Sequence, residues 1–342
     1  MPFISNLLNY KSISFVGMDK NAGKTEALNF VIKRLNDYNR RISVTSIGID
    51  GETLDQVTET SKPRVFLYPD SLFITSEQLY PKREIVSMIE DISHYGTSLG
   101  RLITSRTKSF GNVMLSGPTD TQRLKQLIDD MVSKSDICLI DGALSRKSFA
   151  SPSITDAMIL STGAVVSASI DKIVQKTLFM YEMTKLPEYG VNDLREKLLD
   201  ITHGVYAITK DGEVKDLKIP SMLMLQKYRD TIFSVSKTLF IPGMITDRLL
   251  ELIATQKDKS EFTLITKDFT HVFSNELNTY NFLRNGGKIL CLFKTNLLAI
   301  TVNPVSPQGY KLDSNTLVGK LSEKIPLPVY NIRQIEPDGI FH

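Results

Sequence analysis

The sequence predicts an α/β protein: a mostly parallel sheet flanked by helices, followed by a second, smaller α/β unit. Three observations support this fold class. Short apolar runs alternate with segments of helical spacing along the chain. One run, "ICLIDGA", is almost continuously apolar, as expected of a central strand covered on both faces. The length of 342 residues allows about two domains.

The first part begins with a strand at residues 13–16 and a helix in which apolar residues recur on one face over 27–35. Thr119 starts a pattern typical of a capping box, with Gln122 three residues on, and we expect Thr119 to be the N-cap of the helix that follows. A further helix is expected over 171–185. The other expected strands cover 42–47, 64–68, 71–76, 112–118, 137–143 and 156–167.

Turn-forming residues cluster in "LPEYGVND", residues 186–193, which marks the expected domain boundary. We expect a nucleotide-binding domain over 1–185 and a smaller α/β domain over 200–342, with a partner-binding or regulatory role. Its expected helices cover 220–236, 246–255, 274–285 and 316–321, and its expected strands cover 238–243, 262–266, 288–294, 297–303 and 328–332.

Charge and cysteine content restrict the class of protein. The net charge is +3 and the basic residues are scattered, which argues against nucleic acid as a partner. Cys138 and Cys291 lie in apolar runs, which favours buried, reduced thiols. Residues 1–12 lack the pattern of a signal peptide, and no apolar run approaches the roughly 18 residues that cross a bilayer. We therefore expect a cytoplasmic protein that does not bind membranes.

The segment "GMDKNAGKT", residues 17–25, contains the main candidate site. Five residues separate Gly17 from the Gly-Lys-Thr triplet, whereas the common phosphate-binding loop has four. A strand precedes the segment and a helix follows it, as a phosphate-binding loop requires. The alternative is a strand–turn–helix connection that contains Gly-Lys-Thr by chance.

Backbone N–H groups of such a loop can surround a phosphate at the start of a helix. Lys24 would reach the terminal phosphates, and the Thr25 hydroxyl would hold Mg²⁺. Lys20 could lie over the phosphates or be solvated. The predicted nucleotide-binding residues are Gly17, Asp19, Lys20, Asn21, Ala22, Gly23, Lys24, Thr25 and Glu26.

Acidic residues at the ends of two other strands extend the candidate site. Asp141 ends the run "ICLID", where a parallel sheet would bring it near the loop as a second Mg²⁺ ligand; the alternative is an aspartate that only starts a turn. Asp50 and Glu52 follow the second strand and could face the same crevice, with one of them orienting a water or sensing the γ-phosphate, or form a solvated turn. With Lys24 and Asp141, Asp50 completes the predicted catalytic set.

The polar tract "RKSFASPSITD" after Asp141 is either a functional loop that brings Arg146 or Lys147 to the nucleotide, or a surface crossover. The four histidines have no metal-ligand spacing.

The spacing in "GMDKNAGKT" resembles that of the "GTDTxVGKT" loop of dethiobiotin synthetases, a group within the P-loop NTPases. More specifically, the chain resembles the P-loop ATPase subunit of the lysine 5,6-aminomutase reactivase of lysine-fermenting bacteria. The segments that carry this resemblance are "SFVGMDKNAGKT", "GTSLGRLI", "GNVMLSGP", "LIDGALSRKSFASP", "TDAMILSTGA", "LLAITVNPVSPQGYKLD" and "LPVYNI".

The resemblance implies a Mg²⁺-dependent ATPase of P-loop NTPase fold that is slow without its partner. It would act with a MutS-related second subunit on an aminomutase that depends on adenosylcobalamin and pyridoxal phosphate. ATP hydrolysis would drive release of damaged cobalamin. The chain has no D-x-H-x-x-G cobalamin motif, which suits a chaperone of the mutase better than the mutase itself.

Two other functions stay open at the level of sequence. One is an ATP-dependent small-molecule ligase of the dethiobiotin-synthetase type, although such enzymes carry Glu-Gly-Ala-Gly-Gly where this chain has "IDGALSR". The other is a nucleotide-binding scaffold with little turnover. The sequence has no motif that distinguishes ATP from GTP.

Overall fold

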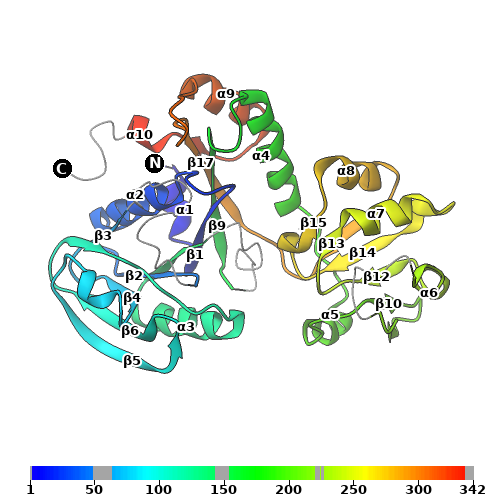
Figure 1. Ribbon diagram of the computed structural model, residues 1–342, viewed down its shortest axis with the longest axis horizontal. Coiled ribbons are helices and arrows are strands. Elements are labelled where there is room, and N and C mark those ends of the chain that lie inside the picture. The colour runs from blue at the N-terminus through cyan, green and yellow to red at the C-terminus, as the bar shows by residue number, and fades with distance from the viewer. Residues whose placement is uncertain (1, 49–63, 143–153, 220–223, 225–226, 336–342) are drawn as a thin grey trace. The chain divides into compact units, whose positions relative to one another are not determined.

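A computed structural model describes residues 2–48, 64–142, 154–219, 224 and 227–335. The chain divides into two compact units (Figure 1). Unit 1 comprises Met1–Leu178 and Asn296–His342, and unit 2 comprises Phe179–Thr295. Unit 2 is therefore inserted into the chain of unit 1. This division differs from the expected domain over 200–342, because the C-terminal residues return to unit 1.

Unit 1 is built on a large sheet with the strand order β18-β17-β9-β1-β8-β2-β4-β6-β5. The strands from β18 to β4 are mutually parallel, and β6 is antiparallel to both of its neighbours. The mostly parallel sheet predicted from the sequence is thus confirmed. Its strands are β1 (Ser12–Gly17), β2 (Ile42–Ser46), β4 (Leu72–Ser76), β5 (Ser87–Thr97), β6 (Gly100–Thr107), β8 (Ile137–Asp141), β9 (Ala157–Gly163), β17 (Leu297–Asn303) and β18 (Val329–Tyr330). A separate antiparallel pair consists of β3 (Val65–Leu67) and β7 (Gly111–Val113).

Helices cover both faces of this sheet (Figure 1). Along β8, Leu139 packs in one hydrophobic cluster with α1 and α2, whereas Cys138 and Ile140 pack in another with α3. Burial on both faces explains the continuous apolar run of this strand. The helices of unit 1 are α1 (Pro2–Leu7), α2 (Lys24–Asp37), the 3₁₀-helix η1 (Tyr80–Lys82), α3 (Thr121–Lys134), α9 (Ser314–Lys324) and α10 (Ile332–Ile335), and α4 (Ile170–Thr184) runs from unit 1 into unit 2.

Unit 1 differs from the sequence-based expectation at several places: α1 and α10 were not predicted, and the strand expected over 112–118 is limited to β7. Two further differences have a local physical reason. The N-cap of α3 is Asp120 rather than Thr119, because the Asp120 carboxylate accepts a hydrogen bond of 2.9 Å from the backbone N–H of Arg123. The antiparallel strands β5 and β6 had no predicted counterpart. Most of β5 is exposed, so its sequence lacks the alternation of a half-buried strand.

Unit 2 has its own sheet, with the strand order β11-β10-β12-β14-β16. Strands β12, β14 and β16 are parallel, and β10 pairs antiparallel with both of its neighbours. The strands of unit 2 are β10 (Tyr206–Ile208), β11 (Val214–Asp216), β12 (Thr238–Phe240), β13 (Ile245–Thr246), β14 (Thr263–Thr266), β15 (Val272–Phe273) and β16 (Lys288–Cys291). Its helices are α5 (Asn192–Leu199), α6 (Arg229–Val235), α7 (Asp247–Ala254), η4 (Lys259–Glu261), η5 (Phe269–His271) and α8 (Glu276–Arg284).

Both cysteines are free and buried. Burial raises the pKa of the Cys138 thiol to about 12 and also raises the pKa of Cys291. Within the described residues, no helix has the length and apolar character needed to cross a membrane.

Candidate functional site

The candidate site begins where β1 ends and α2 starts, between Gly17 and Lys24. The loop closes on itself through a bond of 3.3 Å from the Ala22 N–H to the carbonyl of Asp19. A Cβ at Gly17 would lie 3.0 Å from the same carbonyl and 3.4 Å from the Ala22 Cβ. The narrow turn therefore leaves little room for a side chain at Gly17.

Two residues of the loop have left-handed backbone conformations, Asn21 with φ 61° and Gly23 with φ 95°. Asparagine and glycine are the residues that adopt this region most readily. Gly23 is also the N-cap of α2 and supplies no capping side chain. The first-turn N–H groups of α2 thus keep the orientation that binds anions at helix N-termini.

Lys24, the first residue of α2, forms an ion pair with Asp141 at the end of β8. Its Nζ lies 2.6 Å from Asp141 Oδ1, and the side chains are 21% and 7% exposed. The pair forms because β8 lies next to β1, with Asp141 opposite Phe15 in the register. The tertiary structure thus joins a lysine and a carboxylate that lie 117 residues apart in the sequence.

The remaining predicted residues of the loop have different surroundings. Thr25 is buried in the first turn of α2, and Glu26 forms an ion pair of 2.7 Å with Arg333. Asp19 and Lys20 are exposed, and the Asp19 carboxylate accepts a bond of 2.7 Å from the Lys20 N–H.

Four further predicted residues, Asp50, Glu52, Arg146 and Lys147, lie outside the described residues. In the part of the chain that the structure describes, no group of three or more His, Cys, Asp or Glu residues could hold a metal ion.

Elements far from the loop in the sequence hold it in place. The Met18 N–H donates to the carbonyl of Ser161 on β9 at 2.8 Å. The Asn303 side-chain amide, at the end of β17, donates to the carbonyl of Asn21 at 3.1 Å. Neither Ser161 nor Asn303 was predicted as a site residue. The only available sequence signal was a polar residue near the carboxyl end of an apolar strand, a common feature.

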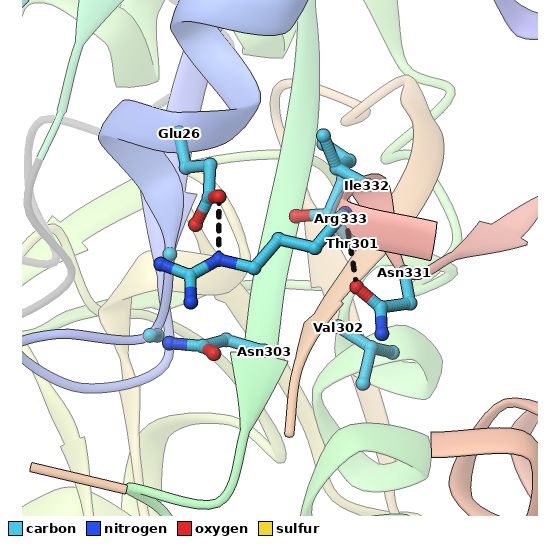
Figure 2. A pocket seen from close by; sticks show the side chains of 9 residues that line it. Glu26, Thr301, Val302, Asn303, Asn331, Ile332 and Arg333 are labelled. Atoms are coloured by element: carbon cyan, nitrogen blue, oxygen red, sulfur yellow. Dashed lines mark hydrogen bonds and ion pairs between the residues drawn. The ribbon is translucent and has the colours of Figure 1, made fainter. Parts of the chain in front are cut away.

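A small pocket of about 10 Å³ lies beside the loop, bordered by the Glu26–Arg333 ion pair (Figure 2). That volume accommodates about one water molecule. The pocket is lined by Ala22, Gly23, Glu26, Thr301, Val302, Asn303, Asn331, Ile332 and Arg333.

No protein-family model matches the chain, and comparisons with curated proteins and with solved structures find no match. The chemistry of the site is therefore argued from its own residues and from the sequence motifs.

Proposed function

We propose that the chain is a Mg²⁺-dependent nucleoside triphosphatase of the P-loop type, which binds ATP at the loop 17–25. The ion pair between Lys24 and Asp141 is the observation that carries this proposal. It brings a cation suited to phosphate and a carboxylate suited to Mg²⁺ to the carboxyl ends of two adjacent parallel strands. Ligands of open α/β sheets bind at this edge.

The proposal gives roles to the backbone of the loop and to several of its side chains. Backbone N–H groups of the loop and the first turn of α2 bind the phosphates, and the left-handed Asn21 and Gly23 set the curvature of the loop. Lys24 neutralises the terminal phosphates. The exposed Asp19 and Lys20 and the first-turn Glu26 border the bound nucleotide.

Thr25 and Asp141 provide the protein ligands of Mg²⁺. One or two protein oxygens suffice, because Mg²⁺ keeps several waters and also binds phosphate oxygens. The metal would neutralise negative charge that develops during phosphoryl transfer. Asp50 would orient the attacking water.

The ion pair implies an order of events at the site. Without nucleotide, Lys24 is bound to Asp141. A triphosphate carries more negative charge than one carboxylate and therefore competes for the lysine. With Lys24 on the phosphates, the Asp141 carboxylate would be available to hold Mg²⁺.

For the cellular role, we propose reactivation of an adenosylcobalamin-dependent aminomutase, most specifically lysine 5,6-aminomutase. The sequence resemblance described above supports this role. The chain would act with a MutS-related subunit, and ATP hydrolysis would promote release of damaged cobalamin from the mutase.

Two measurements test these proposals. Purified chain should bind ATP in the presence of Mg²⁺ and hydrolyse it slowly, and parallel titration with GTP determines the preferred base. Inactivated aminomutase should regain activity only when the chain, the MutS-related subunit, ATP and fresh adenosylcobalamin are all present. Multiple turnover with a small carboxylic or amino substrate and no protein partner would instead establish a ligase. ATP binding without hydrolysis under every condition would establish a scaffold.

A further inference from the structure

Unit 2 is joined to unit 1 by two segments, α4 on the N-terminal side and the residues leading into β17 on the C-terminal side (Figure 1). Both α4 and β17 contain a residue that contacts the loop 17–25. The contacts come from opposite ends of the insertion in the sequence, and each is made by a polar side chain.

The contact from α4 is made by Thr177, which is fully buried. Its hydroxyl donates to the Met18 sulfur at 3.3 Å and lies 2.9 Å from the hydroxyl of Thr162 on β9. A hydroxyl donates one hydrogen, so Thr162 is the donor of the second bond. Met18 directly follows Gly17, and Thr177 therefore packs against the start of the loop.

The contact from β17 is made by Asn303. Its amide nitrogen donates to the Asn21 carbonyl, and its amide oxygen accepts a bond of 3.1 Å from the Val305 N–H. Its Cβ lies 3.1 Å from the position that a Cβ on Gly23 would take. Asn303 thus binds one left-handed residue of the loop and packs against the other.

We propose that Thr177 and Asn303 couple the loop to unit 2, so that nucleotide binding alters the two connecting segments and the state of unit 2 alters nucleotide binding. This inference rests on the proposed function, because it requires a nucleotide at the loop. It assigns unit 2 a regulatory role at that site.

The physical argument has two steps. In the structure Lys24 is bound to Asp141; a bound nucleotide would give it phosphate as a partner and would bind N–H groups of the loop, so we expect the segment from Met18 to Gly23 to adjust. Thr177 and Asn303 are bound to that segment and belong to the elements that lead into unit 2. Any coupling must be reciprocal, since equilibrium binding free energies at two sites are linked.

Hydrogen–deuterium exchange of the full chain tests the proposal. Mg²⁺ and ATP should slow exchange in peptides that cover α4 and β17 by about fivefold or more, the lower end of usual coupling strengths. Peptides from β5 and β6 serve as the internal reference and should not change. If ATP binds by titration and neither connecting segment responds, the coupling is wrong while the proposed nucleotide site stands. If ATP does not bind, both proposals fail.

Two variants assign the coupling to the named side chains. Asn303→Ala should remove most of the response at β17, and Thr177→Val most of the response at α4, while ATP still binds. Matched controls remove a comparable hydrogen bond from α4 or from the residue that directly precedes β17, without contacting the loop. Asn296→Ala loses a bond from its amide to the Asp156 carbonyl, and Thr184→Val loses a bond to the Tyr181 carbonyl within α4. Both controls should respond to ATP like the wild type.

The wild-type measurement decides the proposal even where a variant fails to fold, and melting temperatures identify such a variant. Equal responses in the Asn303 and Asn296 variants, and in the Thr177 and Thr184 variants, would overturn the assignment to these contacts.

Discussion

Polar residues that follow the parallel strands make different contacts in the two units. After β1 in unit 1, the loop supplies no capping side chain, and Lys24 pairs with a carboxylate from the neighbouring strand. After β14 in unit 2, Asp268 is fully buried and accepts bonds from the N–H and hydroxyl of Thr270. Its carboxylate also lies 3.3 Å from His271 Nδ1. The Asp268 carboxylate therefore stabilises its own turn.

This difference shows that a parallel sheet provides only a position for a site. A ligand-binding edge also needs backbone donors that no local side chain satisfies, and a functional group contributed by another strand. After β1, the N-terminus of α2 has no side-chain cap and Lys24 faces a carboxylate from β8, whereas the turn after β14 has a carboxylate engaged in its own 3₁₀-helix. The first three predictions below compare matched residues of the two units, and the fourth concerns unit 2 alone.

The largest effect is expected for the two aspartates. Asp141→Asn should lower Mg²⁺-dependent ATP turnover by about a hundredfold or more, because a metal contributes several kcal/mol to transition-state stabilisation. ATP binding without Mg²⁺ should be retained or tighter, since the competing carboxylate charge is removed from Lys24. Steady-state hydrolysis and nucleotide titration measure the two effects. Asp268→Asn should instead lower the melting temperature and leave turnover per folded molecule unchanged. Equal loss of binding and turnover in Asp141→Asn would indicate a structural role for Asp141.

The two lysines give the next comparison. Lys24→Ala removes a charge-assisted contact to phosphate, worth about 1.5–3 kcal/mol, so ATP should bind roughly 10- to 150-fold more weakly. Lys267, which follows β14, donates to the Leu199 carbonyl at 3.3 Å, and burial lowers its pKa. Lys267→Ala should leave ATP affinity unchanged. Calorimetric titration measures both variants, and undiminished ATP binding by Lys24→Ala would exclude the phosphate-loop interpretation.

One glycine in each unit tests whether the backbone after a strand is constrained. Gly23→Ala places a Cβ on a left-handed residue beside Asn303, which should cost about 1–2 kcal/mol of unfolding free energy and weaken ATP binding. Gly243 follows β12, and a Cβ there would meet no atom within 4 Å. Gly243→Ala should change stability by less than about 0.5 kcal/mol. Chemical denaturation measures both variants, and equal stabilities would mean that the loop backbone is not constrained.

The smallest effect concerns a carboxylate of unit 2 and pH. Burial alone would raise the pKa of Asp247, but hydrogen bonds from Ser274, Asn275 and Asn278 outweigh it and lower the pKa. A lowered folded-state pKa gives stability that is present above the unfolded value and lost as the pH falls through the folded value. Exchange protection of α8 should therefore decrease below about pH 4, by no more than about 1 kcal/mol. Asp247→Asn should show less of this pH dependence, and an unchanged acid profile would contradict the assignment.

Local patterns predicted much of the fold and part of the site. The strand, loop and helix around residues 12–37 follow from an apolar run, turn-forming residues and helical periodicity, all of which act over a few residues. The position of Asp141 at the end of a strand also follows from a local pattern, the apolar run that precedes it. Asp120 was missed as the N-cap of α3 because neighbouring Thr119 is also a capping residue by type and Gln122, three residues on, gives it a capping-box spacing. The exposed β5 was missed because its apolar residues follow no regular alternation.

The sequence by itself determined that this chain has an α/β fold and a Gly-Lys-Thr loop between a strand and a helix. Only the tertiary structure decided which strands are neighbours. The order β9-β1-β8 brings Asp141 to Lys24, and the return of β17 to unit 1 brings Asn303 to a loop 282 residues away in the sequence. Periodicity and turn chemistry reflect interactions between residues close in sequence, whereas sheet order depends on packing between distant segments. For that reason the sequence indicated the loop, and the fold identified the residues that hold it.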